Sequence, residues 1–337
     1  MYGLLADRRV RAGLVIVSLA VLAVFPLIVD TYWVTTMIRV FYFGLLAASI
    51  GFLIGQGGMT SLAQTAFFGM TGYVIGLFVT ERGWPVGWTL LLALGMVAVV
   101  ALLFGMVAMR TRDMVFLMIT LAFGQICWAF AQQNTTLLHG WSGIRGIRPP
   151  ALFGLDLTQT TNFYWVALVI FLAAVLLLRR IVKSPFGLAL NGIRESPRRM
   201  AALGYPVYWI RVAAFVIAAL YAGLGGMIAT YSIGSITPTS LALSRTIWVL
   251  LMVILGGASY FWGPYIGAAL AIWLDVIISD HTERYNTIIG IIFVLVVLFA
   301  PQGVLGAAET LKSKIRTTEI GHAQGRASKH EKSRKGQ

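Results

Sequence analysis

Long apolar runs, separated by short polar or basic segments, dominate the hydrophobic pattern of this chain. Charged residues are absent over 13–29, 40–80, 114–138 and 212–244. A helix needs about 20 apolar residues to cross the hydrocarbon core of a bilayer. The runs therefore predict transmembrane helices, and the fold class is an all-α polytopic integral membrane protein.

Two of the apolar runs are too long for one crossing. The run 40–80 contains the glycine-rich stretch 55–58, and the run 246–274 is interrupted at 256–257 and 263–264. Dividing both runs gives about ten transmembrane helices. The expected spans are 13–29, 38–55, 61–80, 88–109, 114–133, 162–178, 209–231, 243–257, 264–279 and 287–305. The eighth and ninth spans are short, and a hairpin that enters the membrane only partway stays an alternative for them.

The distribution of charge predicts the orientation. Only 11% of the 337 residues are charged, whereas soluble domains carry about a quarter. With the N-terminus inside, ten spans place 20 of the 26 basic residues on the cytoplasmic side and six outside, as the positive-inside rule requires. We therefore expect a cytoplasmic N-terminus over 1–12, a transmembrane domain over 13–306 and a cytoplasmic tail over 307–337.

The tail is rich in basic and small polar residues, with eight of the 26 Lys and Arg after position 311. It lacks an apolar period, so it is predicted to be disordered. Its charge favours contact with anionic membrane lipid rather than with nucleic acid.

One basic loop stands out inside the membrane domain. Seven Arg and Lys residues lie within 179–211, against a single acid, Glu195. A simple connection between helices needs only a few residues. The cytoplasmic loop 179–208 therefore either fixes the topology alone or also offers a docking surface.

A second feature is the glycine-rich and polar segment between the second and third expected spans. Irregular backbone at membrane depth is tolerated only against protein or a water-filled cavity, and such breaks line solute routes in transporters. An ordinary turn in which Ser61 caps the next helix is the alternative. The candidate translocation-path residues are Gln56, Gly57, Gly58, Thr60, Ser61, Gln64 and Thr65, with Gly225 and Gly226 from a later span, although helix packing also explains those two glycines.

Several chemistries are disfavoured by the sequence. No segment matches the phosphate-binding pattern GxxxxGK[ST], so any ATP-driven step needs another polypeptide. No acid or His lies well inside an expected span, which disfavours a standalone secondary transporter or channel. No catalytic set can be assembled, so a membrane enzyme or assembly factor is the weakest alternative. Cys127 is the single cysteine, and we expect no disulfide, metal or cofactor.

An ordered set of short motifs carries a family resemblance. The chain resembles the permease subunits of branched-chain amino-acid ABC importers, of the LivM type, over roughly 38–306. The motifs are GQGGMTSLAQ at 55–64, TLAFGQ at 120–125, SPFGL at 184–188, IRE at 193–195, AALG at 201–204, LGG at 255–257, GPYIGA at 263–268 and PQGVLG at 301–306. Gln64 stands where that family commonly has His, and Ala63 where it has Gly, which leaves the solute open.

The resemblance implies a non-catalytic subunit in a bacterial inner membrane. Its partners would be a sister permease, two cytoplasmic ATPases and an extracytoplasmic solute-binding protein, and its solute a branched-chain or related small amino acid. Urea and short-chain amides are alternative solutes. The cytoplasmic loop would carry the coupling helix that docks on the ATPase over 187–204. The residues assigned to this role are Gly187, Ile193, Arg194, Glu195, Arg198, Ala201, Leu203 and Gly204.

Overall fold

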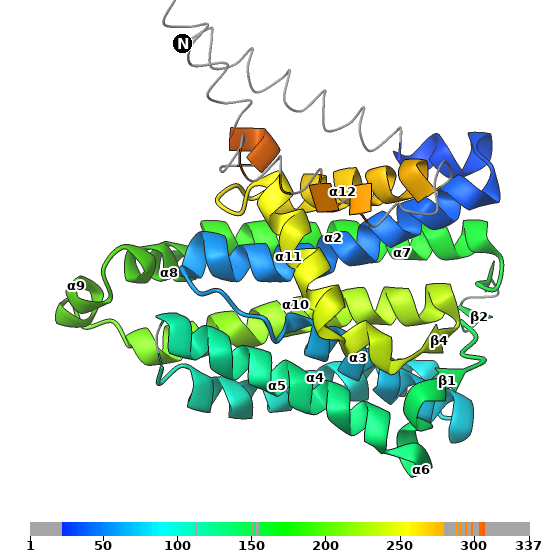
Figure 1. Cartoon of the computed structure of the whole chain (residues 1–337), viewed down its shortest axis with the longest axis horizontal. Helices are drawn as coiled ribbons and strands as arrows, with labels where there is room; N and C mark the ends of the chain where they lie inside the picture. The colour runs from blue at the N-terminus through cyan, green and yellow to red at the C-terminus, as the bar shows by residue number, and fades with distance from the viewer. Residues whose placement is uncertain are drawn as a thin grey trace, which may run out of the picture.

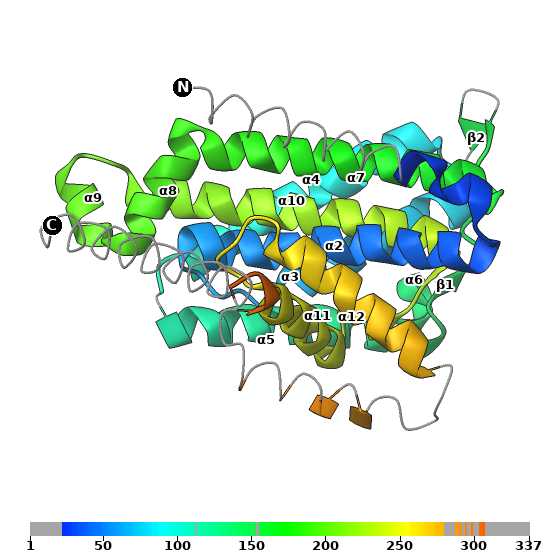
Figure 2. The same cartoon turned by 90° about the horizontal axis from the view of Figure 1, so that it is seen from above.

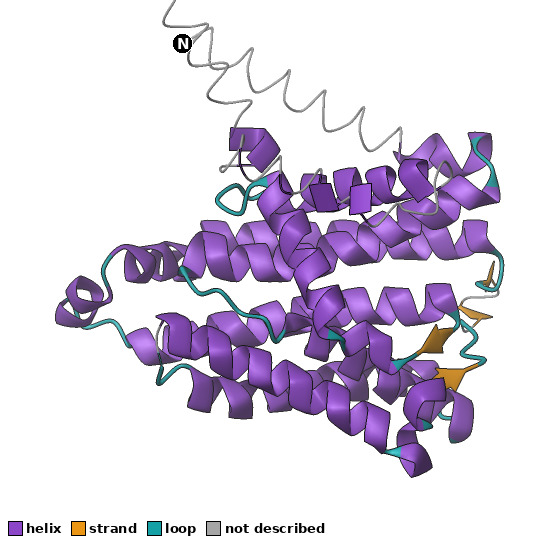
Figure 3. Ribbon diagram, viewed as in Figure 1, coloured by secondary structure: helices purple, strands orange, loops and turns teal. Residues whose placement is uncertain are grey.

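The computed structural model describes residues 22–111, 113–149, 151–152, 155–279, 287–288, 290–291, 294, 298 and 303–306. Figure 3 shows that helices form almost all of this part of the chain, with a few short strands at one end. The tail, the first residues and most of the first and last expected spans lie outside the described residues. The ten-helix count and the location of the two termini therefore stay predictions.

Five helices are long and apolar enough to cross a membrane. They are α2 (Thr31–Gly57), α4 (Val86–Ala108), α5 (Asp113–Gln133), α7 (Thr160–Lys183) and α10 (Val207–Ile233). Each has 21 to 27 residues, which meets the requirement of about 20 for one crossing. The predicted all-α membrane class is confirmed at this level.

Three shorter helices pack with them in the part of the chain that the structure describes. They are α3 (Gln64–Ile75), which continues as the π-helix η1 (Gly76–Glu81), α11 (Leu243–Gly256) and α12 (Gly263–Ser279). Both predicted divisions of the long apolar runs are confirmed, because the helices are interrupted over 58–63 and 257–262. The first interruption begins later than expected, since α2 stays helical through Gln56 and Gly57 and ends at Gly58, whose φ is +62°.

Helices α2 and α10 form the centre of the molecule. Most of their residues are buried, whereas fewer than a third of the residues of α4, α5 and α7 are. Figures 1 and 2 show α2 and α10 running lengthwise through the bundle, with α3 beside them. Gly225 and Gly226 permit this packing. A β-carbon on Gly225 would lie 2.8 Å from the carbonyl oxygen of Tyr42, and one on Gly226 would lie 2.1 Å from that of Phe68.

The two ends of the bundle differ. At one end, α7 leads into two short helices, α8 (Pro185–Glu195) and α9 (Pro197–Ala202), which project beyond the other helices in Figure 1. We call this the α8–α9 end.

The opposite end, the strand end, contains the connecting loops. Its elements are α6 (Thr135–Leu138), η2 (Gly140–Ser142), β1 (Ile144–Arg145), β2 (Ala151–Leu152), β3 (Leu155–Asp156), β4 (Ser235–Ile236) and η3 (Pro238–Leu241). Strand β1 pairs antiparallel with β4, and β2 with β3. The pairing of β1 with β4 joins the loop region before α7 to the loop after α10, which lie far apart in the sequence.

Candidate functional site

Two prolines define the helices of the α8–α9 end. Pro185 and Pro197 each occupy the first helical position, where the missing N–H costs nothing and the fixed φ favours the helix. Ser196 caps α9, because its Oγ accepts a hydrogen bond from the backbone N–H of Arg199. Gly187 allows the sharp turn after α7, since a β-carbon there would lie 2.1 Å from the carbonyl oxygen of Val182.

The predicted coupling segment divides into a buried and an exposed part. On α8, Gly187, Leu190 and Ile193 face the interior of the chain, and Ile193 is only 1% exposed. No residue of α9 is buried. The exposed part contains Arg194, Glu195, Arg198, Ala201, Leu203 and Gly204.

Two large apolar side chains lie on the exposed part. Leu188 is 69% exposed and Leu203 is 72% exposed, and the basic Arg198 and Arg199 are exposed near Leu203 in sequence. Ile193, which the sequence assigned to partner contact, instead packs within this chain. The surface available to a partner is therefore formed by Leu188, Leu203 and the charged residues of α9.

Helix α8 is fixed to the end of α2. The guanidinium of Arg194 donates a hydrogen bond to the carbonyl oxygen of Gly55, one of the last carbonyls of α2. Such carbonyls lack helical partners, and a cation is favourable at a helix C-terminus. A β-carbon on Gly58 would lie 2.9 Å from Cγ of Arg194, and one on Gly57 would lie 3.6 Å from Leu190. The predicted coupling segment and the predicted path segment are thus in direct contact.

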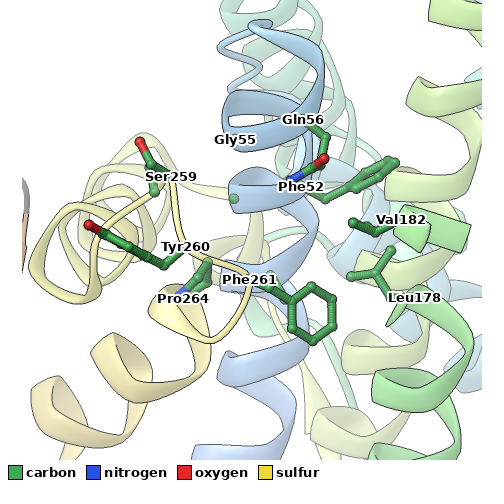
Figure 4. Close-up of a pocket in the computed structure, with 12 residues that line it drawn as sticks. Phe52, Gly55, Gln56, Leu178, Val182, Ser259, Tyr260, Phe261 and Pro264 are labelled. Atoms are coloured by element: carbon green, nitrogen blue, oxygen red, sulfur yellow. The ribbon is translucent and has the colours of Figure 1, made fainter. Parts of the chain in front are cut away.

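The loop 257–262 lies on the opposite side of the α2 terminus. Figure 4 shows Ser259, Tyr260 and Phe261 beside Gly55 and Gln56 of α2 and Leu178 and Val182 of α7. The cavity among these residues measures about 20 Å³, which is room for about one water molecule. Gln56 therefore lies at a packed junction, and no solute-sized space adjoins it here.

The interrupted segment 58–63 is held by side-chain hydroxyls. The N–H of Leu62 donates to Oγ1 of Thr120 on α5 over 3.2 Å, and the N–H of Ala63 donates to Oγ of Ser61 over 3.3 Å. Ser61 is buried and Thr60 is half-buried. Ser61 does not cap α3, because the N-cap position is Ala63 and no side chain makes a capping hydrogen bond to the first turn of the helix. The segment 58–63 therefore does not form the ordinary turn in which Ser61 caps α3.

A buried polar cluster follows at the start of α3. Oγ1 of Thr65 and Oγ1 of Thr246 on α11 are 2.6 Å apart and share a hydrogen bond. Gln64 is fully buried, and neither atom of its amide has a hydrogen-bond partner in the described part of the chain. Thr120 and Thr246 were not predicted from the sequence as members of this cluster. The sequence offered only a weak indication of these two residues, because isolated threonines are common in apolar helices.

The strand end contains a larger polar cavity. It measures about 450 Å³ and lies where α2, α7 and α10 meet the loop at 147–149, with Arg148, Thr160 and Ser232 among its walls. Nearby, the carboxylate of Asp156 accepts hydrogen bonds from the N–H and the hydroxyl of Thr158. These bonds hold the pKa of that carboxyl below its ordinary value.

An ion pair links two helices towards this end. Arg39 of α2 and Asp275 of α12 are 3.1 Å apart. Arg245 lies with its guanidinium carbon 5.4 Å from the ring centre of Phe43. Among the described residues, His, Cys, Asp and Glu form no group able to hold a metal ion.

Known proteins resemble this chain over most of its length. The high-affinity branched-chain amino acid transport system permease proteins LivM of Escherichia coli K12 and of Salmonella typhimurium LT2 are each 27% identical over 88% of this chain and 75% of their own. A probable LivM protein of Methanocaldococcus jannaschii is 25% identical over 39% of this chain and 38% of its own.

Among solved structures, PsaBC from Streptococcus pneumoniae in complex with Fab superposes with a TM-score of 0.44 and 15% identity, over 84% of this chain and 97% of that one. This likeness is too weak to support a conclusion. The family model described as branched-chain amino acid transport system / permease component matches residues 32–300. The chain therefore belongs to the branched-chain amino acid permease family, as a LivM-type, multi-pass protein of the plasma membrane.

Proposed function

We propose that this chain is the membrane-spanning, non-catalytic permease subunit of an ATP-binding-cassette importer for branched-chain or related small amino acids. Its partners are a sister permease, two cytoplasmic ATPases and an extracytoplasmic solute-binding protein. The family membership supports the role in transport. The observation that carries the rest is the division of residues 185–204 into a buried anchor and an exposed basic and apolar surface.

The α8–α9 end is assigned to the cytoplasm. Arg179, Arg180 and Lys183 are the last basic residues of α7, and Arg198 and Arg199 follow on α9. Basic residues next to membrane helices concentrate on the cytoplasmic side. The strand end then faces outwards, and its open polar cavity of about 450 Å³ receives solute from the binding protein.

In this proposal the exposed surface docks on an ATPase and the buried anchor transmits its motion. Leu188 and Leu203 supply apolar contact, and Arg198 fixes the register. Leu190 and Arg194 connect α8 to Gly57 and Gly55. Movement of α8 therefore displaces the end of α2 and the adjoining segment 58–63.

Coupling also has an energetic requirement. The ATPases shift the permease between inward-open and outward-open states only if their ATP-bound and ATP-free forms bind the two states with different affinities. Docking with equal affinity to both states would leave the equilibrium between them unchanged, however tight the binding is.

Purification and reconstitution test the proposal. The wild-type chain should co-purify with a sister permease and two ATPases. In proteoliposomes with the binding protein, ATP should drive uptake of leucine, isoleucine or valine, and urea and acetamide should compete poorly. Charge reversal of the docking surface by Arg198→Glu with Arg199→Glu should weaken ATPase association.

The matched control is Arg179→Glu with Arg180→Glu, which places the same charge change on α7 outside the docking surface. Unchanged ATPase association in the α9 variant would reject the docking surface. Uptake by this chain alone under an ion gradient would reject the importer, and a preference for urea over leucine would reject the solute class.

A further inference from the structure

Helix α3 begins inside the bundle rather than at its end. Helix α2 has 27 residues, whereas α3 and η1 together have 12 and six. At 1.5 Å per residue these correspond to about 40 Å and about 27 Å. Figure 1 shows the connection after α2 running from the α8–α9 end towards the middle of the molecule, where α3 starts. The N-terminus of α3 is therefore at membrane depth.

This terminus presents unpaired donors. The first four N–H groups of a helix have no helical acceptor, and α3 has no side-chain cap. The N–H of Ala66 bonds to the carbonyl oxygen of Ala63, whereas the N–H groups of Gln64 and Thr65 find no acceptor in the described chain. The aligned peptide dipoles add partial positive charge at the same point.

No acidic side chain from the surrounding helices offsets this positive end. Helices α2, α3, α10 and α11 contain no Asp or Glu. Helix α5, which contributes Thr120, has its single acid, Asp113, at its first position, about two turns away. A negatively charged group is thus favoured here, as at other helix N-termini.

The amide of Gln64 is the second and independent observation. The side chain is 0% exposed, and both its nitrogen and its oxygen lack partners in the described chain. The neighbouring hydroxyls of Ser61, Thr65 and Thr120 all have partners. A buried polar group without a partner costs free energy, and such an exception indicates an absent ligand or a functional role. Gln64 is the first residue of α3, and helical side chains lean towards the N-terminus of their helix, which is where the unpaired N–H groups lie.

We propose that Gln64 and the first turn of α3 form a binding site for a zwitterionic α-amino acid within the permease, which rests on the importer function proposed above. The solute carboxylate accepts from the Gln64 amide nitrogen and from the N–H groups of Gln64 and Thr65. The solute ammonium donates to the Gln64 amide oxygen. One amide thus complements both charges, and half-helix termini bind anionic substrate groups in this way in other transporters. Because Gln64 is fully buried, the site is closed in the conformation described.

Thiol labelling tests whether the electrostatic potential at this site is positive. The sole native cysteine of this chain is first removed by Cys127→Ala, and Ala63→Cys, at the N-cap position of α3, is introduced in the complete permease–ATPase complex without binding protein, so that Gln64 is kept. During ATP turnover, an anionic methanethiosulfonate sulfonate should modify position 63 severalfold faster than a cationic trimethylammonium analogue. Excess leucine should slow the reaction, and leucinamide, which lacks the carboxylate, should not.

Position 80 provides the matched control, because Thr80 is exposed at the far end of η1. In Thr80→Cys, leucine should protect against neither reagent. Absence of labelling at position 63, faster labelling by the cation, or equal protection by leucinamide would overturn the site. Failure of the importer function is distinguishable, because wild-type complex would then not form or would not take up leucine.

A second variant separates binding from structure. Gln64→Leu replaces the unpartnered amide with an apolar group of similar length. We expect a higher Tm of the complex and a severalfold slower ATP-driven leucine uptake. A structural role for the amide predicts the opposite change in Tm. Gln133→Leu, at the exposed end of α5, should leave uptake unchanged. A lower Tm, or normal uptake, in Gln64→Leu would contradict the proposal.

Discussion

The guanidinium of Arg194 in α8 donates a hydrogen bond to the carbonyl oxygen of Gly55 in α2, although 139 positions separate the two residues. One is a charged side chain that the sequence assigns to a partner surface. The other is the backbone of a glycine before the helix break. Their contact joins the segment proposed to receive the ATPase motion to the segment proposed to respond to it.

Removal of this contact should uncouple transport from ATP hydrolysis. Arg194→Ala is expected to lower the free energy of unfolding by about 1 kcal/mol, because a charge-assisted hydrogen bond at a helix end is lost. ATPase association should persist, since Leu188, Leu203 and Arg198 remain. The ratio of leucine transported to ATP hydrolysed should fall. Arg194→Lys should recover part of this ratio, whereas loss of association in Arg194→Ala would place Arg194 at the ATPase surface.

The left-handed conformation of Gly58 should make it intolerant of a side chain. Gly58→Ala adds a β-carbon at a φ of +62° and 2.9 Å from Cγ of Arg194. Gly83 has nearly the same φ, +64°, with open space around it, so Gly83→Ala measures the backbone cost alone, about 1 kcal/mol. Thermal unfolding should show a larger loss for Gly58→Ala. Equal losses of stability in the two variants would mean that contact with α8 adds nothing to the cost of a side chain at Gly58.

The hydroxyl pair of Thr65 and Thr246 should behave as one interaction. Thr65→Val or Thr246→Val alone leaves a buried hydroxyl facing a methyl group, at a cost of about 1–2 kcal/mol. The double variant should cost less than the sum of the single ones, because neither hydroxyl remains. A double-mutant cycle by chemical denaturation measures the coupling, expected at about 0.5–2 kcal/mol. Simple additivity would show that α3 and α11 are not joined by this bond.

The stability of the turn before α7 should depend on pH. Hydrogen bonds from Thr158 lower the pKa of the Asp156 carboxyl. A carboxyl whose pKa is lower in the folded chain than in the unfolded chain stabilises the folded turn at pH values above the unfolded pKa. This stabilisation is lost as pH falls through the folded pKa. The hydrogen-exchange protection factors over 156–162, which correct for the intrinsic effect of pH on exchange, should therefore fall below about pH 4. In Asp156→Asn the acid-dependent part of that change should disappear, and its persistence would assign the effect to another group.

Much of the fold was predictable from local patterns. The length of each apolar run gave the positions of α4, α5, α7 and α10 to within a few residues, because crossing the hydrocarbon core sets a minimum helix length. The glycines at 55–58 and at 256–257 indicated that two runs divide. The ends of helices were less predictable: α7 continues through the basic residues to Lys183, because long basic side chains can reach water from a helix end.

The candidate site was predictable only as a set of segments. Sequence reasoning singled out Arg194 and Gly58 separately, and nothing along the chain indicated that they touch. It also placed Ile193 on the partner surface, since an apolar residue beside charges looks the same whether it faces inwards or outwards. Thr246, the partner of Thr65, has no distinguishing neighbour in the sequence.

The sequence by itself determined that this chain crosses the membrane many times, where its helices divide and which loop is most basic. These properties depend on the transfer of each residue between water and hydrocarbon, which local composition specifies. Only the tertiary structure decided which side of α8 is buried, which carbonyl Arg194 binds and that the amide of Gln64 is enclosed without a partner. These depend on the packing of α2, α3, α5, α8 and α11, whose contacts join residues far apart in the chain.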